Sequence, residues 1–201
     1  MKKLIDFPLV YQQMQKRGYI NAENYLWLNE IEWMTLDEIY NYHYDEGENK
    51  EIIPFAFTGG GDKWVWVINS KEPEYSVGLC ENGESNGIYY ARNMEDAIFR
   101  QIIEFVSDSN FYRNVREAKS YQIGERELKK ILKQWALCFD GILKEEYLSL
   151  IKRLEQMQLK CVKSKYGEWE ALLTLNEKNA ILDQYIKFEF LDCEFEWYSL
   201  E

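Results

Sequence analysis

Hydrophobic residues follow different spacings in successive parts of this 201-residue chain, and each spacing predicts a different kind of element. Between residues 51 and 92, short runs of β-branched and aromatic residues alternate with turn formers. These runs predict strands over 52–57, 64–68, 75–80 and 88–91. The connections are too short for crossovers, so we expect an antiparallel meander. The strand over 64–68 is apolar on both faces, which predicts a central position.

Three further elements are predicted before this meander. Pro8 opens a helix over residues 7–17. The apolar run 25–31 predicts a strand. Thr35 and Glu38 have the Thr-x-x-Glu spacing of a capping box, in which each side chain bonds a free backbone N–H of the other residue. A short helix should therefore begin at Thr35.

A longer helix should follow the meander, with Asn93 as its cap. Its inward stripe comprises Met94, Ile98, Ile102, Phe105 and Val106, and its outer residues are Arg100, Gln101 and Glu104. This helix should cover one face of the sheet. The polar stretch 107–124 has no sustained apolar period and predicts a domain boundary.

Helical and strand spacings both occur after that boundary. Two apolar stripes, over 128–139 and 147–157, flank a turn at Gly141 and predict a helical hairpin. Alternation over 169–175, after an apolar segment at 159–162, predicts a β-hairpin. The alternation over 188–197 changes parity, which predicts one strand with a β-bulge near Phe190 and Leu191.

The expected fold class is α+β, with a mainly antiparallel sheet flanked by helices. We divide the chain into an α+β domain, residues 1–108, and a C-terminal helix-plus-strand extension, residues 109–201. Composition supports a packed core, because hydrophobic residues make up 46% and aromatic residues 16% of the chain.

Acidic charge is concentrated in the first half of the chain. Residues 1–108 carry 9 basic and 19 acidic residues, whereas residues 109–201 carry 15 and 16, within a total net charge of −11. A strongly acidic domain repels phosphate, and the sequence has no basic cluster interleaved with aromatic residues. We therefore expect no direct binding to nucleic acid.

The sequence also predicts a reduced, cytoplasmic protein. Asp6 and Pro8 interrupt any apolar stretch that could follow the basic start, and no run of about 18 apolar residues suggests a membrane span. The four cysteines are far apart, unlike those of metal sites or compact disulfide scaffolds. They are Cys80, Cys138, Cys161 and Cys193.

Residues able to support catalysis are few. His43 is the one histidine, and we interpret it as a surface or structural residue. The run Gly59-Gly60-Gly61 lacks phosphate-loop spacing and leads into a strand, so it predicts a tight turn in which Asp62 bonds backbone N–H groups. Cys80 is expected to be a small buried side chain. We expect no catalytic residues, cofactor or metal.

One stretch resembles a known family. Ile53-Pro54-Phe55-Ala56, then Gly61-Asp62 and the strand Trp64-Val65-Trp66-Val67-Ile68, are similar to the SUKH superfamily, which includes fungal cell-wall-synthesis regulators and many bacterial immunity proteins. The resemblance covers residues 7–107; upstream, Phe7-Pro8-Leu9-Val10-Tyr11 and Gly18 keep the family's Pro, Tyr and Gly positions, but Arg17 replaces an Asn. It implies an α+β fold and a cytoplasmic protein that neutralises a polymorphic toxin, often a nuclease or deaminase.

The expected function is therefore non-catalytic binding of a cognate, basic toxin protein. The acidic loops could present a negative field to such a partner, although most acidic loops only keep a protein soluble. The candidate partner-binding residues are Asp45, Glu46, Glu48, Asp62, Glu72, Glu74, Glu81 and Glu84. The alternative is a regulatory or scaffold module that binds a host protein or small ligand. A carboxylate-only enzyme would need a deep pocket that holds two carboxylates.

Overall fold

The computed structural model describes residues 6–21, 24–29, 31–68, 74–107, 124–164 and 167–199. The chain forms two compact units: unit 1 comprises Met1–Ile98 and Ile186–Glu201, and unit 2 comprises Phe99–Tyr185. The predicted boundary over 107–124 lies, apart from its two end residues, outside the described residues. The division into 1–108 and 109–201 stays a prediction.

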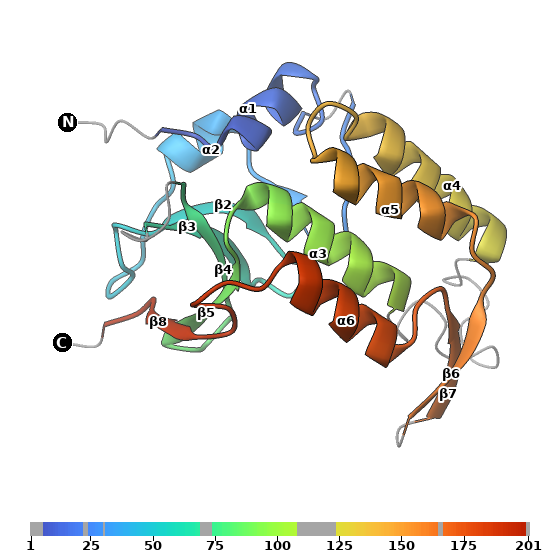
Figure 1. Cartoon of the computed structure of the whole chain (residues 1–201). Helices are drawn as coiled ribbons and strands as arrows, with labels where there is room; N and C mark the ends of the chain where they lie inside the picture. The colour runs from blue at the N-terminus through green and yellow to red at the C-terminus, as the bar shows by residue number, and fades with distance from the viewer. Residues whose placement is uncertain are drawn as a thin grey trace. The chain divides into compact units, whose positions relative to one another are not determined.

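Unit 1 is built on a six-strand antiparallel sheet, in the order β1-β2-β3-β4-β5-β8 (Figure 1). The strands are β1 (Glu32–Trp33), β2 (Ile53–Phe57), β3 (Lys63–Val67), β4 (Ser76–Cys80), β5 (Asn86–Ala91) and β8 (Glu194–Glu196). The predicted α+β class and the β2–β5 meander are confirmed. The last strand, β8, reaches the sheet from a distant part of the sequence and pairs with β5.

One face of this sheet carries Trp64 and Trp66, which are 1% and 0% exposed. Helices α1 (Leu9–Lys16) and α2 (Leu36–Tyr40) lie over that face (Figure 1). The Tyr11 ring of α1 meets Trp66 edge-on at 5.0 Å between centroids. Because β2 and β4 flank β3 and both of its faces are buried, the predicted central position of β3 is confirmed.

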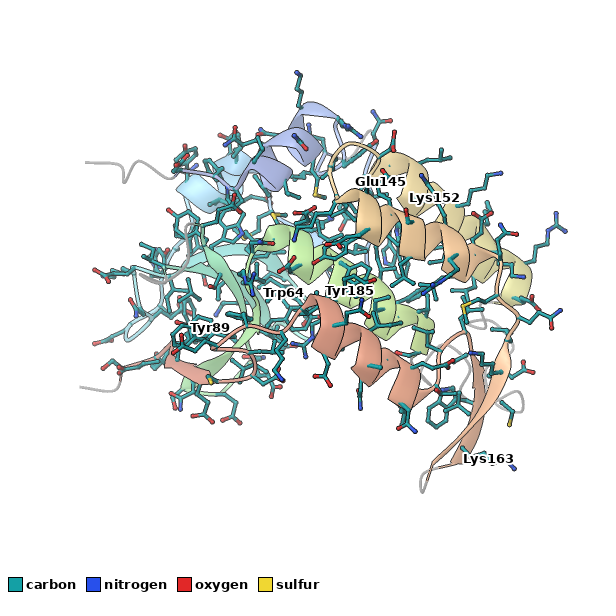
Figure 2. The ribbon with its side chains drawn as sticks, in the orientation of Figure 1. Trp64, Tyr89, Glu145, Lys152, Lys163 and Tyr185 are labelled. Atoms are coloured by element: carbon teal, nitrogen blue, oxygen red, sulfur yellow. The ribbon has the colours of Figure 1, made fainter. Side chains whose placement is uncertain are left out.

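The opposite face of the sheet has a smaller apolar cluster. It comprises Ile52, Val65, Val67, Cys80 and Trp197, with Tyr44, Tyr89, Phe195 and Tyr198 packed against it. Trp64 and Tyr89, labelled in Figure 2, lie on opposite sides of the sheet. Segments around residues 44–52 and 195–198 therefore cover this part of the second face.

Two glycines make room for that cover. A Cβ on Gly78 would lie 2.5 Å from a ring carbon of Phe195, and a Cβ on Gly87 would also overlap this ring. Real Cβ atoms do not approach other atoms this closely. The Phe195 ring therefore occupies the space that a side chain at position 78 or 87 would fill.

The helix starts predicted in unit 1 are confirmed. Pro8 is the residue before α1, and Gly18 follows the helix with a φ of 78°, which favours glycine. The capping box of α2 is complete, since the Thr35 N–H donates to Glu38 at 2.6 Å and the Glu38 N–H donates to Thr35 Oγ1 at 3.3 Å.

The strand predicted over 25–31 is wrong. In the described part of this segment, only Leu28 and Ile31 make a β-type contact, an isolated bridge to each other. The backbone of Leu26 bonds elsewhere: its N–H donates to the Tyr19 carbonyl, and its carbonyl accepts from Trp33 Nε1. The apolar residues Leu26, Leu28 and Ile31 are therefore buried side chains of a loop and do not form a strand.

Helix α3 (Met94–Ser107) begins where Asn93 Oδ1 accepts a hydrogen bond from the Asp96 N–H at 2.9 Å. Its predicted inward stripe is buried, but Gln101, predicted to lie outside, is only 3% exposed. Because Phe99, Ile102 and Ile103 are also buried, burial around this part of the helix is much wider than one stripe. Periodicity could not identify an outer side here.

Unit 2 contains a helical hairpin and a β-hairpin, both as predicted. Helices α4 (Glu125–Cys138) and α5 (Glu145–Glu155) contact each other across a turn in which Gly141 has a φ of 68°. Strands β6 (Lys160–Ser164) and β7 (Gly167–Ala171) pair antiparallel.

A sixth helix in the described chain, α6 (Leu175–Tyr185), was not predicted. The strand alternation assigned to 169–175 ends with β7 at Ala171. Thr174 and Glu177 form a second capping box, with the Thr174 N–H donating to Glu177 Oε2 at 2.9 Å and the Glu177 N–H to Thr174 Oγ1 at 3.3 Å. Tyr185, labelled in Figure 2, contacts Phe99 and Tyr147, whose rings stack at 3.9 Å.

The bulged strand predicted over 188–197 is wrong in its first half. Residues 189–192 form turns, Asp192 has a φ of 60°, and only Glu194–Glu196 is a strand. The Leu191 N–H donates to the Phe188 carbonyl and the Asp192 N–H to the Tyr89 carbonyl. The Leu191 bond is local to the turn, whereas the Asp192 bond reaches β5. The first half of the predicted strand is therefore a turn, and hydrogen bonding to β5 begins at Asp192.

Candidate functional site

Glu48 lies inside unit 1, although the sequence placed it among the exposed partner-binding residues. Its side chain is 2% exposed, and Oε1 lies 2.7 Å from the Lys63 ammonium group at the start of β3. Oε2 accepts hydrogen bonds from Tyr42 Oη at 3.2 Å and from the Asp45 N–H at 3.1 Å. A carboxylate enclosed by these three donors orders its own loop, so Glu48 cannot contribute to an exposed acidic surface.

Two groups near Glu48, the Tyr42 hydroxyl and the Cys80 thiol, have raised pKa values. Burial raises the pKa of the Tyr42 hydroxyl, and the Glu48 carboxylate raises it further. Burial also raises the pKa of the Cys80 thiol, with Lys63 acting in the opposite direction. Because a thiolate is the reactive form of cysteine, Cys80 is an inert buried thiol at neutral pH. Its predicted buried position is confirmed at 2% exposure.

Asp62 has a turn role, although its carboxylate does not bond backbone N–H groups of its own turn as predicted. Its Oδ2 accepts from Thr58 Oγ1 at 2.8 Å, and Oδ1 accepts from the Asn82 N–H at 2.9 Å. Gly61 has a φ of 89°, which only glycine adopts easily. Asp62 thus fastens the β2–β3 turn to the β4–β5 turn.

The other predicted acidic residues divide into two groups. Asp45, Glu46, Glu74, Glu81 and Glu84 are exposed, and Glu72 lies outside the described residues. The structure brings Glu46 into one surface hollow and Glu81 with Glu84 into another.

Both hollows contain a carboxylate that sequence reasoning missed. The first, of about 640 Å³, is lined by Glu46, Gly47, Glu48, Asn49, Lys50, Glu196, Tyr198 and Ser199. The second, of about 240 Å³, is lined by Leu79, Glu81, Glu84, Ser85, Asn86, Ile88 and Glu194. Glu194 and Glu196 are both exposed residues of β8. The sequence feature that could have identified them is the alternation Glu194-Phe195-Glu196-Trp197. With the two aromatic residues pointing inward, the two glutamates must face solvent.

Hydrogen bonds hold β8 and the residues after it in this position. The Trp197 and Tyr198 N–H groups donate to the Ser85 carbonyl at 3.0 and 2.8 Å. From the other side, the Asn49 N–H donates to the Trp197 carbonyl at 2.9 Å. Lys63 Nζ also lies 5.4 Å from the Trp197 ring centroid, which adds a cation–π contact. The two β8 carboxylates are therefore fixed at the edge of the sheet.

Five exposed carboxylates, which we call the acidic rim, surround the two hollows of unit 1: Glu46, Glu81, Glu84, Glu194 and Glu196. The described residues contain no group of three or more His, Cys, Asp or Glu side chains placed to hold a metal ion. His43 is exposed. What the acidic rim can do chemically is attract and orient cationic groups.

Within the described ranges, no helix is long and apolar enough to cross a membrane. In the comparisons with known proteins, no family model, curated protein or solved structure matches the chain.

Proposed function

We propose that this chain is a non-catalytic immunity protein that binds and neutralises a basic toxin domain of the nuclease or deaminase class. The observation that carries the proposal is the acidic rim, which gathers residues from three distant parts of the sequence at one edge of the sheet. The resemblance of residues 7–107 to the SUKH superfamily supplies the class of partner.

Electrostatics explains why such a partner would be selected. A toxin that acts on nucleic acid needs Lys and Arg side chains to neutralise phosphates. The same side chains are attracted by a carboxylate-rich surface, which speeds association and disfavours acidic partners.

The first test is capture followed by neutralisation. The tagged full-length chain is used to capture proteins from its native host, and each captured toxin-like domain is assayed for nuclease or deaminase activity with and without the chain. We expect a basic toxin domain at equal stoichiometry and loss of its activity on binding. A regulatory host protein as the only stable partner, or a captured toxin that stays active, would overturn the proposal.

The electrostatic contribution has its own test with the captured toxin. Changing Glu46, Glu81, Glu84 and Glu196 to Gln should slow association about tenfold at low salt, with little difference at high salt. The matched control changes four carboxylates of unit 2, Glu125, Glu127, Glu145 and Glu146, to Gln. If both variants associate equally fast, the acidic rim does not steer the partner.

A further inference from the structure

Among the residues that the structure describes, no strand pairs with the outer edge of β8 in the six-strand sheet. Strand β8 is the last strand in the sheet order, next to β5. Residues 193 and 197, on either side of the strand, bond to β5 through Tyr89 and Ser85. Antiparallel ladders alternate, so Phe195 bonds to β5 while the N–H and C=O groups of Glu194 and Glu196 point away from it. Of these groups, the Glu194 N–H, the Glu194 C=O and the Glu196 N–H can pair with an added strand.

The open length is short. Beyond Glu196, the segment around Glu48 runs antiparallel to Tyr198, and the Ser199 N–H donates to the Gly47 carbonyl at 2.9 Å. Asn49 Nδ2 also reaches the Glu196 carbonyl at 3.5 Å. An added strand would therefore pair with Glu194–Glu196 and end where this segment begins.

The two residues of β8 whose backbone groups point away from β5, Glu194 and Glu196, each also line one of the hollows. Glu194 borders the hollow with Leu79 and Ile88 in its lining, and Glu196 borders the hollow that contains Tyr198. In an added strand, the residues directly opposite Glu194 and Glu196 would be two positions apart and on the same face. A Lys or Arg side chain there could lay its methylene groups on the apolar lining and its charge among the carboxylates.

Charge decides between the possible occupants of this edge. A second copy of β8 would place Glu opposite Glu, which is unfavourable, and acidic edges are one way in which proteins avoid pairing with themselves. A strand with basic residues at alternate positions would instead place a positive charge opposite each Glu, which is favourable.

We propose that the β8 edge accepts an extended segment of the partner as a seventh strand, with Lys or Arg at alternate positions beside Glu194 and Glu196. This mode of recognition rests on the proposed function, because it specifies how the basic partner is held. Main-chain hydrogen bonds would supply affinity and the two hollows would supply specificity.

The test uses the full-length chain and a short fluorescent peptide in which lysine alternates with threonine. Two control peptides have the same charge: one has all lysines in a block, and the other is N-methylated at its lysine amides, which removes the donors opposite Glu194 and Glu196. We expect the alternating peptide to bind at least about tenfold more tightly than either control at low salt. Equal binding of all three peptides would overturn the proposal.

Amide hydrogen exchange provides the site-specific readout. At saturating alternating peptide, exchange of the Glu194 and Glu196 amides should slow at least about tenfold, whereas the Phe195 amide, already bonded to β5, should change little. The double variant Glu194→Gln with Glu196→Gln should weaken peptide binding, and the control Glu145→Gln with Glu146→Gln should not. Peptide binding without slower exchange at Glu194 and Glu196 would refute strand addition.

The same readout separates the two proposals. If a toxin domain is captured and neutralised while the Glu194 and Glu196 amides exchange as before, strand addition is wrong and the immunity function stands. If the alternating peptide protects these amides but no toxin is neutralised, the immunity function is wrong and the edge remains a site for basic strands.

Discussion

Gly78 of β4 leaves space for the Phe195 ring, and a side chain at this position would occupy that space. Replacement by Ala places a Cβ 2.5 Å from the Phe195 ring and 3.2 Å from the Ile88 carbonyl. The ring must move, and overpacking of this kind costs about 1–3 kcal/mol. We expect Gly78→Ala to lower the free energy of unfolding by that amount in chemical denaturation.

Gly59→Ala is the matched control for this change. A Cβ at Gly59 would meet only Glu32 Oε1, at 3.8 Å, which is an ordinary contact. Equal stability of the Gly78→Ala and Gly59→Ala variants would show that Phe195 does not depend on the space above Gly78.

Individual residues also mark where sequence reasoning succeeded. Asn93, Thr35 and Glu38 were assigned correctly because a cap depends on neighbours within three positions. Glu48 was misplaced because its partner, Lys63, lies fifteen positions away at the start of β3. Periodicity along the chain cannot predict a contact between residues so far apart. The whole charged run 45–51 was therefore expected to be exposed to solvent.

Helix α6 is tied to its neighbouring strand through one carboxylate at its first turn. Glu177 accepts from Thr174, and its Oε1 lies 2.6 Å from Lys160 Nζ of β6. The hydrogen bond from Lys160 is the largest of the influences that lower the pKa of Glu177 from 4.5 to about 2. The ionised form therefore stabilises the fold above about pH 4.5, and this contribution is lost as the pH falls toward about 2.

The variant Glu177→Gln tests this dependence. It should be less stable than the parent chain at neutral pH, and the difference should shrink as the pH falls from 4.5 toward 2, as followed by denaturation at each pH. Because the carboxylate is partly exposed, we expect a modest effect. Lys160→Met should reproduce part of it while leaving the cap intact. A difference that does not vary with pH would refute the assignment.

At the scale of elements, success depended on how local the signal was. The meander β2–β5 was predictable because turn formers separate its strands at short intervals. The start of α6 has the same Thr-x-x-Glu spacing as α2, but the prediction was based only on the alternation from Trp169 to Leu175, which predicts a strand. The ends of strand β8 could not be predicted from periodicity, because a strand of three residues is too short to show a repeat. Its position is set by its pairing with β5.

The acidic rim was only partly predictable for the same reason. Glu46, Glu81 and Glu84 follow from the acidic loops beside the strands, whereas Glu194 and Glu196 join them only through the pairing of β8 with β5. The site is thus a product of topology as well as composition.

Unit 1 as a whole depends on residues that follow unit 2 in the sequence. Ending the chain after Tyr185 removes β8 together with Phe195 and Trp197, and exposes apolar residues such as Val65 and Val67. We expect the shortened chain to lose slow amide exchange across β4 and β5 and to bind a hydrophobic dye. Unit 2, which lies within 99–185, provides the internal reference in the same exchange experiment. Unchanged protection in β4 and β5 would contradict this prediction.

The distant origin of β8 also has a consequence during synthesis on the ribosome. Chains grow at about 5–20 residues per second, so the roughly 100 residues between β5 and β8 take on the order of 5 to 20 seconds to translate. Throughout that interval β5 is an unpaired edge, and the glycine-lined space of β4 and β5 lacks the Phe195 ring. Because unpaired strand edges favour aggregation, the nascent chain is most prone to aggregate during this interval. It gains the sixth strand of its sheet and its full acidic rim only when β8 emerges.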